Sequence, residues 1–211
     1  LRGYSVLDQE YVSGGGSGAV GLFWSSDSIG KASYIGGTAI FRFQTINADE
    51  ISVLSSNAIV KHAGTFYWPG MHQFYQFTGG RVSPVPNDVN INWFYENLNF
   101  DQRQKVWGVQ NERWGEVWWF FPETGQTECT RAIIFNVHET LRTQRAVWYD
   151  TTLARSAGDR PKHFRYPIWT DTSAPATLYL HENGTDAAGA AISSYVDTPW
   201  LNMADDNSAD L

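Results

Sequence analysis

The stretch that decides the fold is Trp114-Gly-Glu-Val-Trp-Trp-Phe-Phe121, in which six of eight residues are apolar and five of those six are aromatic. Aromatic and β-branched side chains favour a pleated, half-buried surface, so the stretch predicts a β-strand. A polar connection with Pro122 and Gly125 follows, and then a second β-rich segment, Arg131-Ala-Ile-Ile-Phe-Asn-Val137. Gly and Pro between two such runs are typical of a turn. The two segments are therefore predicted to pair as neighbouring strands.

Short segments of the same kind recur along the chain, separated by clusters of Gly, Asn and Ser. The strands predicted before the aromatic stretch are 39–43, 51–54, 58–62, 65–68 and 73–77. A second strand cluster is predicted over 105–149, and a third comprises 178–181 and 191–196 around the turn 182–186. A short helix is predicted over 89–97, and a helical turn capped by Asn99 over 99–104.

The domain organisation predicted from this pattern is an all-β fold of antiparallel strands with one or two short helices. It comprises an irregular Gly/Ser-rich segment over 1–34, a β-propeller-like domain over 35–200 and an acidic, flexible tail over 201–211. The first residue is Leu1 rather than Met, so we expect the sequence to be part of a longer protein.

A weak internal repeat supports the blade-like interpretation. Gly64-Thr-Phe-Tyr-Trp68, followed by Phe74-Tyr-Gln-Phe77, resembles Gly115-Glu-Val-Trp-Trp119, followed by Ile133-Ile-Phe135. The two glycines lie 51 residues apart, and a third unit at Thr177-Leu-Tyr-Leu180 is spaced less regularly. A period near this length in an all-β chain is typical of propeller blades with four strands each.

Composition limits the possible partners. The formal charge is −7 and the sequence pI is about 5.1, which argues against a general, phosphate-neutralising surface for DNA. The single cysteine, Cys129, excludes an intrachain disulfide framework and a multi-cysteine zinc site. We expect it to be a small buried residue of the Ile-rich strand. No run of 18 apolar residues is present, so no membrane span is predicted.

Two patterns that could bind cofactors or metals are interpreted as structural. Gly16-Ser-Gly-Ala-Val-Gly21 matches G-x-G-x-x-G, but the residues after it open a helix poorly, so it predicts a surface loop. The five histidines form neither H-x-x-x-H nor H-E-x-x-H; they are His62, His72, His138, His163 and His181. The pairs His138-Glu139 and His181-Glu182 are expected at surface turns or strand ends, and no cofactor or metal is predicted.

Catalytic and saccharide-binding hypotheses remain as alternatives. Glu112 and Glu116 flank Trp114, and with Asp150 they are the candidate acids of a propeller hydrolase, which needs two carboxyls facing across a cleft. No G-x-S-x-G motif is present and Cys129 has no evident activating neighbour, so no catalytic residue is predicted. The possible carbohydrate-stacking indoles are Trp107, Trp114, Trp118 and Trp119, although such residues more often form a core or subunit interface. The sequon Asn183-Gly-Thr185 is interpreted as a hairpin turn.

Several strings resemble one family of virion proteins. They are Phe66-Tyr-Trp-Pro-Gly70, Asn97-Leu-Asn-Phe-Asp-Gln-Arg-Gln-Lys-Val106, Arg113-Trp-Gly-Glu-Val-Trp-Trp-Phe-Phe-Pro122, Glu128-Cys-Thr-Arg-Ala-Ile-Ile-Phe-Asn-Val137, Trp148-Tyr-Asp-Thr-Thr-Leu-Ala-Arg-Ser-Ala-Gly158 and Leu178-Tyr-Leu-His-Glu182. Over roughly residues 35–200 the chain resembles the tailed-bacteriophage structural proteins of the tail nozzle and of the packaged-DNA stabilisation, or head–tail connector, β-propeller group.

The resemblance implies a virion protein made in the host cytoplasm and assembled as a homo-oligomeric ring, commonly a hexamer, below the portal and its adaptor. Such a ring forms part of the DNA exit channel and helps to retain packaged DNA, and it has no catalytic residues to carry over. An acidic lumen lets DNA slide without sequence-specific binding. Family members are much longer, so this chain is not expected to close a propeller alone. The alternative is a carbohydrate-binding β-propeller module at a cell surface or, less favoured, a glycoside hydrolase.

Overall fold

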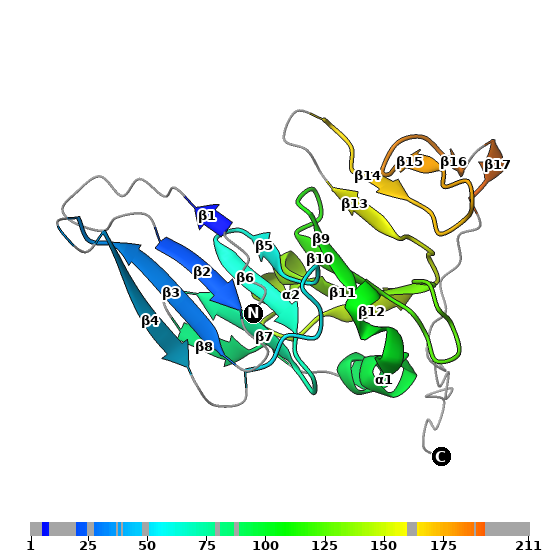
Figure 1. The fold of residues 1–211 in the computed structure, drawn as a ribbon. Helices are drawn as coiled ribbons and strands as arrows, with labels where there is room; N and C mark the ends of the chain where they lie inside the picture. The colour runs from blue at the N-terminus through cyan, green and yellow to red at the C-terminus, as the bar shows by residue number, and fades with distance from the viewer. Residues whose placement is uncertain are drawn as a thin grey trace, which may run out of the picture. The chain divides into compact units, whose positions relative to one another are not determined.

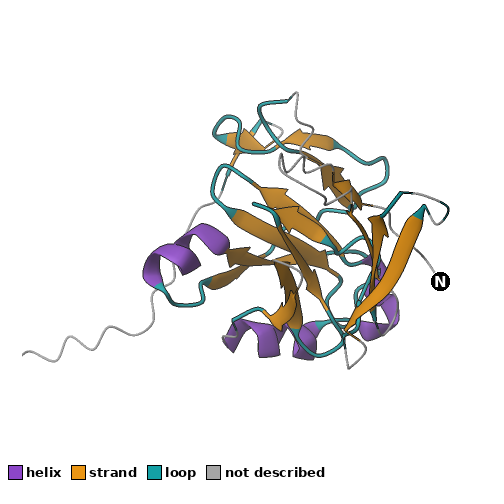
Figure 2. Ribbon diagram, turned by 90° about the vertical axis from the view of Figure 1, so that its left-hand side faces the viewer, coloured by secondary structure: helices purple, strands orange, loops and turns teal. Residues whose placement is uncertain are grey.

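The structure is a computed structural model that describes residues 6–8, 20–24, 28–36, 38, 40–47, 51–78, 81–86, 89–159, 164–187 and 189–192. Antiparallel strands dominate it and the helices are short, which confirms the predicted all-β class (Figures 1 and 2). The chain divides into two compact units, Leu1–His181 and Glu182–Leu211. The predicted tail over 201–211 and most of the loop Gly16–Gly21 lie outside the described residues.

Three four-stranded sheets follow one another along the chain, and in each the strands pair antiparallel with the next in sequence. The first meander comprises β1 (Val6–Asp8), β2 (Val20–Trp24), β3 (Ile29–Tyr34) and β4 (Phe41–Asn47). The second comprises β5 (Val60–His62), β6 (Thr65–Pro69), β7 (Phe74–Thr78) and β8 (Arg81–Pro84). The third comprises β9 (Trp107–Asn111), β10 (Glu116–Phe121), β11 (Arg131–Asn136) and β12 (Trp148–Thr151).

Smaller elements complete the described chain. A three-stranded sheet comprises β13 (Ala157–Asp159), β14 (Ile168–Thr170) and β15 (Leu178–Leu180). The second unit holds the hairpin of β16 (Asp186–Ala187) and β17 (Ala190–Ala191). The helices are α1 (Val89–Asn97), the 3-10 helix η1 (Phe100–Lys105) and α2 (Val137–Thr143).

The predicted pairing of the aromatic stretch is confirmed. β10 pairs with β11 in a register that sets Trp118 opposite Ile134 and Trp119 opposite Ile133. The helices predicted over 89–97 and 99–104 are also present. Asn99 is the N-cap of η1, but its side chain makes no cap hydrogen bond and donates instead to the carbonyl of Gln126 at 2.8 Å.

Other predicted elements were wrong. The strand cluster over 105–149 also contains helix α2, which continues directly from β11. The helix was not predicted because the β-rich residues before it favoured a strand. The segment 51–54 forms no strand, although its residues Ile51 and Leu54 are buried. Residues of the segment expected to be irregular, 1–34, form β1, β2 and β3.

The aromatic run exists because β10 is covered on both faces. Val117, Trp119 and Phe121 pack into a core shared with the second meander and helix α1. Phe120 packs on the opposite face, against Trp169 of β14. A strand buried on both sides reads as a continuous apolar run rather than an alternating one. A third core joins the first and second meanders; it contains Leu22, Trp24, Ile29, Ile51, Phe66, Trp68 and Tyr75.

The repeat seen in the sequence has a structural counterpart. Gly64 and Gly115 both lie in the turn before a meander's second strand, with φ of +81° and +68°, a region that favours glycine. Each second strand, β2, β6, β10 and β14, carries one buried tryptophan; these are Trp24, Trp68, Trp119 and Trp169. The meanders are therefore variants of one packing unit.

The first strands of the second meander, the third meander and the three-stranded sheet approach one another in turn, whereas the first and second meanders are in contact through β4 and β8. β5 lies beside β9, a parallel bridge joins Asn57 to Trp107, and the Gly108 amide donates to the Asn57 carbonyl at 2.9 Å. A side chain at Gly108 would lie 2.5 Å from Cγ2 of Val60, so glycine allows the close approach. β9 also contacts β13.

Candidate functional site

A buried carboxylate lies at one end of the third meander. The Glu116 side chain is only 7% exposed. Its Oε2 accepts from the indole Nε1 of Trp118 at 2.9 Å, and its Oε1 accepts from the Tyr149 hydroxyl and from Nδ2 of Asn136 at 3.4 Å. Hydrogen-bond donors of this kind compensate for the cost of burying a charged group. These four residues are called the Glu116 cluster below.

Strand register brings the Glu116 cluster together. Glu116 lies opposite Asn136 of β11, while Trp118 lies opposite Ile134, which in turn lies opposite Tyr149 of β12. Because side chains two residues apart share a face, the polar and aromatic groups point to the same side of the sheet. None of them is close to the others in sequence except Glu116 and Trp118.

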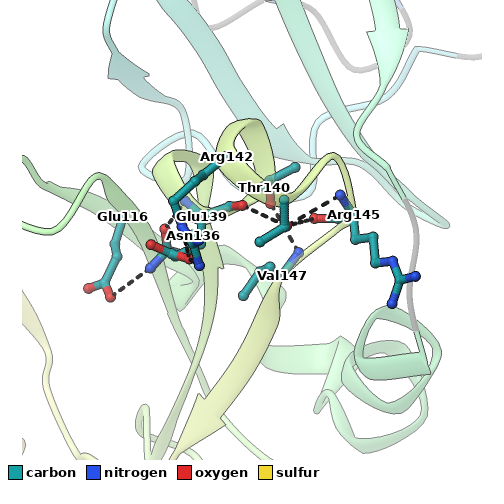
Figure 3. Close-up of polar contacts among 8 residues, drawn as sticks. Glu116, Asn136, Glu139, Thr140, Arg142, Arg145 and Val147 are labelled. Carbon is teal, nitrogen blue, oxygen red and sulfur yellow. Dashed lines mark hydrogen bonds and ion pairs between the residues drawn. The ribbon is translucent and has the colours of Figure 1, made fainter.

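Asn136 connects the cluster to helix α2. Its side chain accepts from the Glu139 backbone N–H at 2.8 Å and is the N-cap of the helix, while its Nδ2 donates to Glu116 (Figure 3). On the exposed side of the helix, Arg142 bonds the Glu139 carboxylate, and this hydrogen bond lowers the pKa of Glu139. The Glu116 cluster thus fixes the junction between β11 and α2.

The candidate acids are not brought together. Asp150 lies opposite Ile133 of β11 and forms an ion pair with Arg131. Glu116 lies opposite Asn136, so its side chain points to the other face of the same sheet. Glu112 is exposed in the β9–β10 turn. A glycosidase requires two carboxyls that face each other, which the side-chain directions of Glu116 and Asp150 do not provide.

The four tryptophans considered as a stacking platform do not lie together; two of them are core residues, the role that the sequence favoured. Trp107 and Trp119 are buried in different cores, because their positions on β9 and β10 place them on opposite faces. Trp118 is half-buried and contacts Trp169, with ring centroids 5.3 Å apart. Trp114 alone of the four is exposed, at 48%, with the Arg113 guanidinium 4.8 Å from its ring centroid.

The lone cysteine is buried, as predicted, although it lies in the loop before β11 rather than in the strand. Burial is the main cause that raises the pKa of the Cys129 thiol to about 12, and the Glu128 carboxylate adds to it. Its Sγ donates to the Lys105 carbonyl at 3.4 Å. A protonated, buried thiol is a poor nucleophile.

The histidines are dispersed. Among the residues that the structure describes, no three His, Cys, Asp or Glu side chains form a group that could hold a metal ion. His72 is exposed and His138 lies in α2, whereas His163 lies outside the described residues. His62 is buried, which lowers its pKa despite an opposing hydrogen bond with Gln110.

His181 lies in the turn at the end of β15, as predicted, but it is half-buried and belongs to an Arg155 cluster. The buried Arg155 donates from Nε to His181 Nε2 at 2.9 Å, and the His181 ring lies 4.0 Å from that of Trp169. The Arg155 guanidinium lies 4.5 Å from the Tyr179 ring centroid. The backbone carbonyl of Arg155 accepts a hydrogen bond from Trp107 Nε1 at 3.0 Å. Burial and the Arg155 charge lower the pKa of His181 to about 4. Nothing in the local sequence predicts this contact between residues 26 positions apart.

The first meander presents an exposed aromatic face. Tyr34 and Phe41 face each other across β3 and β4 with ring centroids 5.9 Å apart, and Phe23 contacts Phe43 at 6.0 Å. Phe43 is 69% exposed. The Phe23 ring lies over Gly30, which has no side chain to obstruct it. These four aromatic residues form the aromatic face, and exposed apolar patches of this kind commonly mark contact surfaces.

β4, at one end of the first meander, is an edge strand, and no strand of the described residues pairs with its outer edge. Natural edge strands are usually protected by Lys, Pro or inward charges. The seven residues of β4, Phe-Arg-Phe-Gln-Thr-Ile-Asn, contain neither Lys nor Pro and only one charge, Arg42. The edge and the aromatic face together are the candidate functional surface.

No protein-family profile matches the chain, and no curated protein matches it. In the described part of the chain, none of the helices has both the length and the apolar content that crossing a membrane requires.

Proposed function

We propose that this chain is a structural component of a bacteriophage tail, part of a nozzle, hub or connector ring that lines the DNA exit channel and helps to retain packaged DNA. The observation that carries the proposal is the succession of three four-stranded antiparallel meanders, the second and third of which have adjacent first strands. Consecutive meanders arranged in this way are the building plan of propeller blades. The family resemblance described above implies the same plan.

The packing of the meanders supports a rigid, blade-like wall. Each pair of consecutive sheets shares an aromatic core, and each second strand contributes a buried tryptophan. Propellers contain typically four to eight blades, so the three complete meanders among the described residues are too few to close one. We therefore propose that further chain or neighbouring subunits complete the structure.

The aromatic face and the β4 edge supply the subunit contact in this proposal. A second copy of the chain is the occupant, because a homo-oligomeric ring requires a contact between identical subunits. Edge strand β4 has no row of charges that would repel a second strand. The other proposed neighbours are the portal, its adaptor and other tail proteins, and the chain performs no catalysis.

The test is assembly of the purified protein, followed by negative-stain electron microscopy and sedimentation velocity. Ring-shaped oligomers are expected, and the double variant Phe41→Ser/Phe43→Ser is expected to reduce them by weakening the contact. Leu178→Ser is the matched control, since Leu178 is 68% exposed on β15 and lies outside the aromatic face. A protein that remains monomeric at high concentration contradicts the assembly proposal. Rings that the double variant leaves intact exclude the aromatic face as the contact.

A further inference from the structure

The turn that follows β15 contains the sequence Glu182-Asn-Gly-Thr-Asp186, and its central residues are exposed. Gly184 has φ of +80°, a conformation that glycine adopts without strain. The turn holds the one Asn-Gly dipeptide of the 211-residue sequence. Asn-Gly turns are common because both residues tolerate left-handed backbone, but the same pair is chemically labile.

The two reacting groups of this dipeptide are unobstructed. Among the hydrogen bonds of the described residues, none engages the Asn183 carboxamide or the backbone N–H of Gly184. A Cβ at Gly184 would meet no heavy atom within 4 Å, so the space beside its Cα is open. Hydrogen bonds and crowding normally hold a backbone amide away from its neighbouring side chain, and neither is present here.

We propose that Asn183 is an intrinsic modification site at which the chain deamidates without an enzyme. The backbone nitrogen of Gly184 loses its proton to solvent base and attacks the Asn183 side-chain carbonyl carbon. The new C–N bond closes a five-membered succinimide, and the side-chain nitrogen leaves as ammonia. Water then adds to either imide carbonyl and opens the ring. The products are aspartate and isoaspartate, with no oxidant or reductant required.

The modification changes charge and backbone length in one turn. A neutral amide becomes a carboxylate between Glu182 and Asp186, which adds one negative charge to the formal −7 of the chain. The isoaspartate product also inserts one extra methylene into the main chain between β15 and β16. Like charges close in an exposed turn repel, so the modified turn is expected to pair less well at β16.

Two other asparagines, Asn136 and Asn57, are expected to be less reactive than Asn183. Asn136 is held by hydrogen bonds to Glu139 and Glu116. Asn57 is exposed but is followed by the buried Ala58. The backbone carbonyl of Asn57 accepts a hydrogen bond from the Gly108 N–H. A side chain after the asparagine hinders ring closure, and a hydrogen-bonded backbone resists the required rotation. Asn57 therefore provides a matched comparison within the same protein.

The experiment incubates the folded protein in mildly alkaline buffer. It follows intact mass, isoelectric focusing and labelling by an isoaspartate methyltransferase, with peptide mapping to place the change. The reference is the free peptide Glu-Asn-Gly-Thr-Asp under the same conditions. Because an exposed turn needs little opening, the protein is expected to convert within about tenfold of the peptide rate. The conversion is expected at Asn183 alone, with a rate that rises with pH.

Two variants complete the test. Asn183→Gln is expected to abolish the acidic species, because the longer side chain would have to form a six-membered ring. Asn57→Gln is expected to leave the rate unchanged. The proposal is overturned if the folded protein yields no acidic species while the peptide converts, or if Asn183→Gln deamidates as fast as the unsubstituted chain.

Discussion

Each aromatic side chain of β10 packs toward one of two cores, and the alternation decides what each one contributes. Trp119 is fully buried between the second and third meanders, and its Nε1 donates to the Ala58 carbonyl at 2.8 Å. Trp114, five residues earlier in the same run, lies in the exposed β9–β10 turn. Because both residues are tryptophans, residue type does not predict which of them contributes more to stability. The difference in burial does.

Replacing each tryptophan by alanine separates these contributions. Trp119→Ala is expected to lower the free energy of unfolding by about 3–5 kcal/mol, through lost burial, a cavity and an unpaired carbonyl. The matched variant Trp114→Ala is expected to cost less than about 1 kcal/mol. Chemical denaturation followed by fluorescence measures both. Equal losses for the two variants would show that the assigned packing of β10 is incorrect.

His181 predicts a pH dependence with a definite sign. Its pKa is lowered to about 4 in the folded chain, mainly by burial and further by Arg155. In the unfolded chain it returns to about 6.5, so the unfolded state binds the proton first as the pH falls. The contribution of His181 to stability is therefore complete above about pH 6.5 and is lost progressively toward pH 4.

The variant His181→Gln tests this dependence. Its side-chain carbonyl retains an acceptor for the Arg155 N–H but does not titrate. The fall in unfolding free energy between neutral and acidic pH is expected to be shallower in His181→Gln than in the original chain. The exposed His72 provides the control substitution His72→Gln, which is expected to preserve the original slope. An unchanged slope in His181→Gln would refute the proposed role of the half-buried imidazole.

At the residue scale, sequence reasoning predicted burial better than partners. The buried cysteine was predicted from its apolar surroundings. The partners of Glu116 and His181 could not be predicted, because they depend on strand register and on contacts between sheets. A carboxylate beside a tryptophan has the same sequence pattern whether it faces solvent or hydrogen-bond donors.

At the scale of elements, the 51-residue repeat carried real information. Gly64 and Gly115 precede equivalent second strands, which the shared Gly-aromatic pattern indicated. The signal weakened at the first meander and at β14, where only the buried tryptophans Trp24 and Trp169 are retained. The residues at which these strands begin and end depend on pairing with neighbouring strands, which cannot be predicted from a single sequence.

Helix α2 was missed although its start signal is present. Asn136 followed by Glu139 three positions later matches the pattern of a capped helix, in which the first side chain accepts from the backbone N–H of the second residue. The β-branched run through Ile133 and Ile134 leads directly into it, so strand propensity obscured the boundary.

Asn136→Ala tests whether this cap stabilises the fold. The variant loses the bond to Glu139 N–H and the donor to Glu116, and an expected cost of at least about 1 kcal/mol follows from the cap alone. Arg142→Ala, which removes only an exposed ion pair with Glu139, is expected to cost measurably less and to depend on salt. Thermal and urea unfolding would reveal the difference, and equal losses would argue against a stabilising cap.

At the scale of the whole molecule, charge and assembly are the properties that matter for the proposed channel. The net charge of −7 makes a general attraction for phosphate unfavourable. We expect fluorescence anisotropy with labelled duplex DNA to show no saturable binding at physiological salt. Tight binding that weakens steeply as salt rises would reveal a basic surface and would contradict a lumen along which DNA slides.

The all-β class followed from aromatic and β-branched segments separated by glycine-rich turns, and the structure confirms it. The closed ring does not follow from sequence or from one chain, since closure depends on chain length and on subunit geometry. The propeller-like description and the tail function therefore remain proposals that assembly and composition must test.

The most direct test of the proposed virion role is mass spectrometry of virus particles purified from cultures in which this sequence is expressed. The account predicts that peptides from residues 35–200 are present at the fixed copy number of a structural ring and remain after stringent washing. Absence of these peptides from intact, infectious particles would contradict a structural role in the virion.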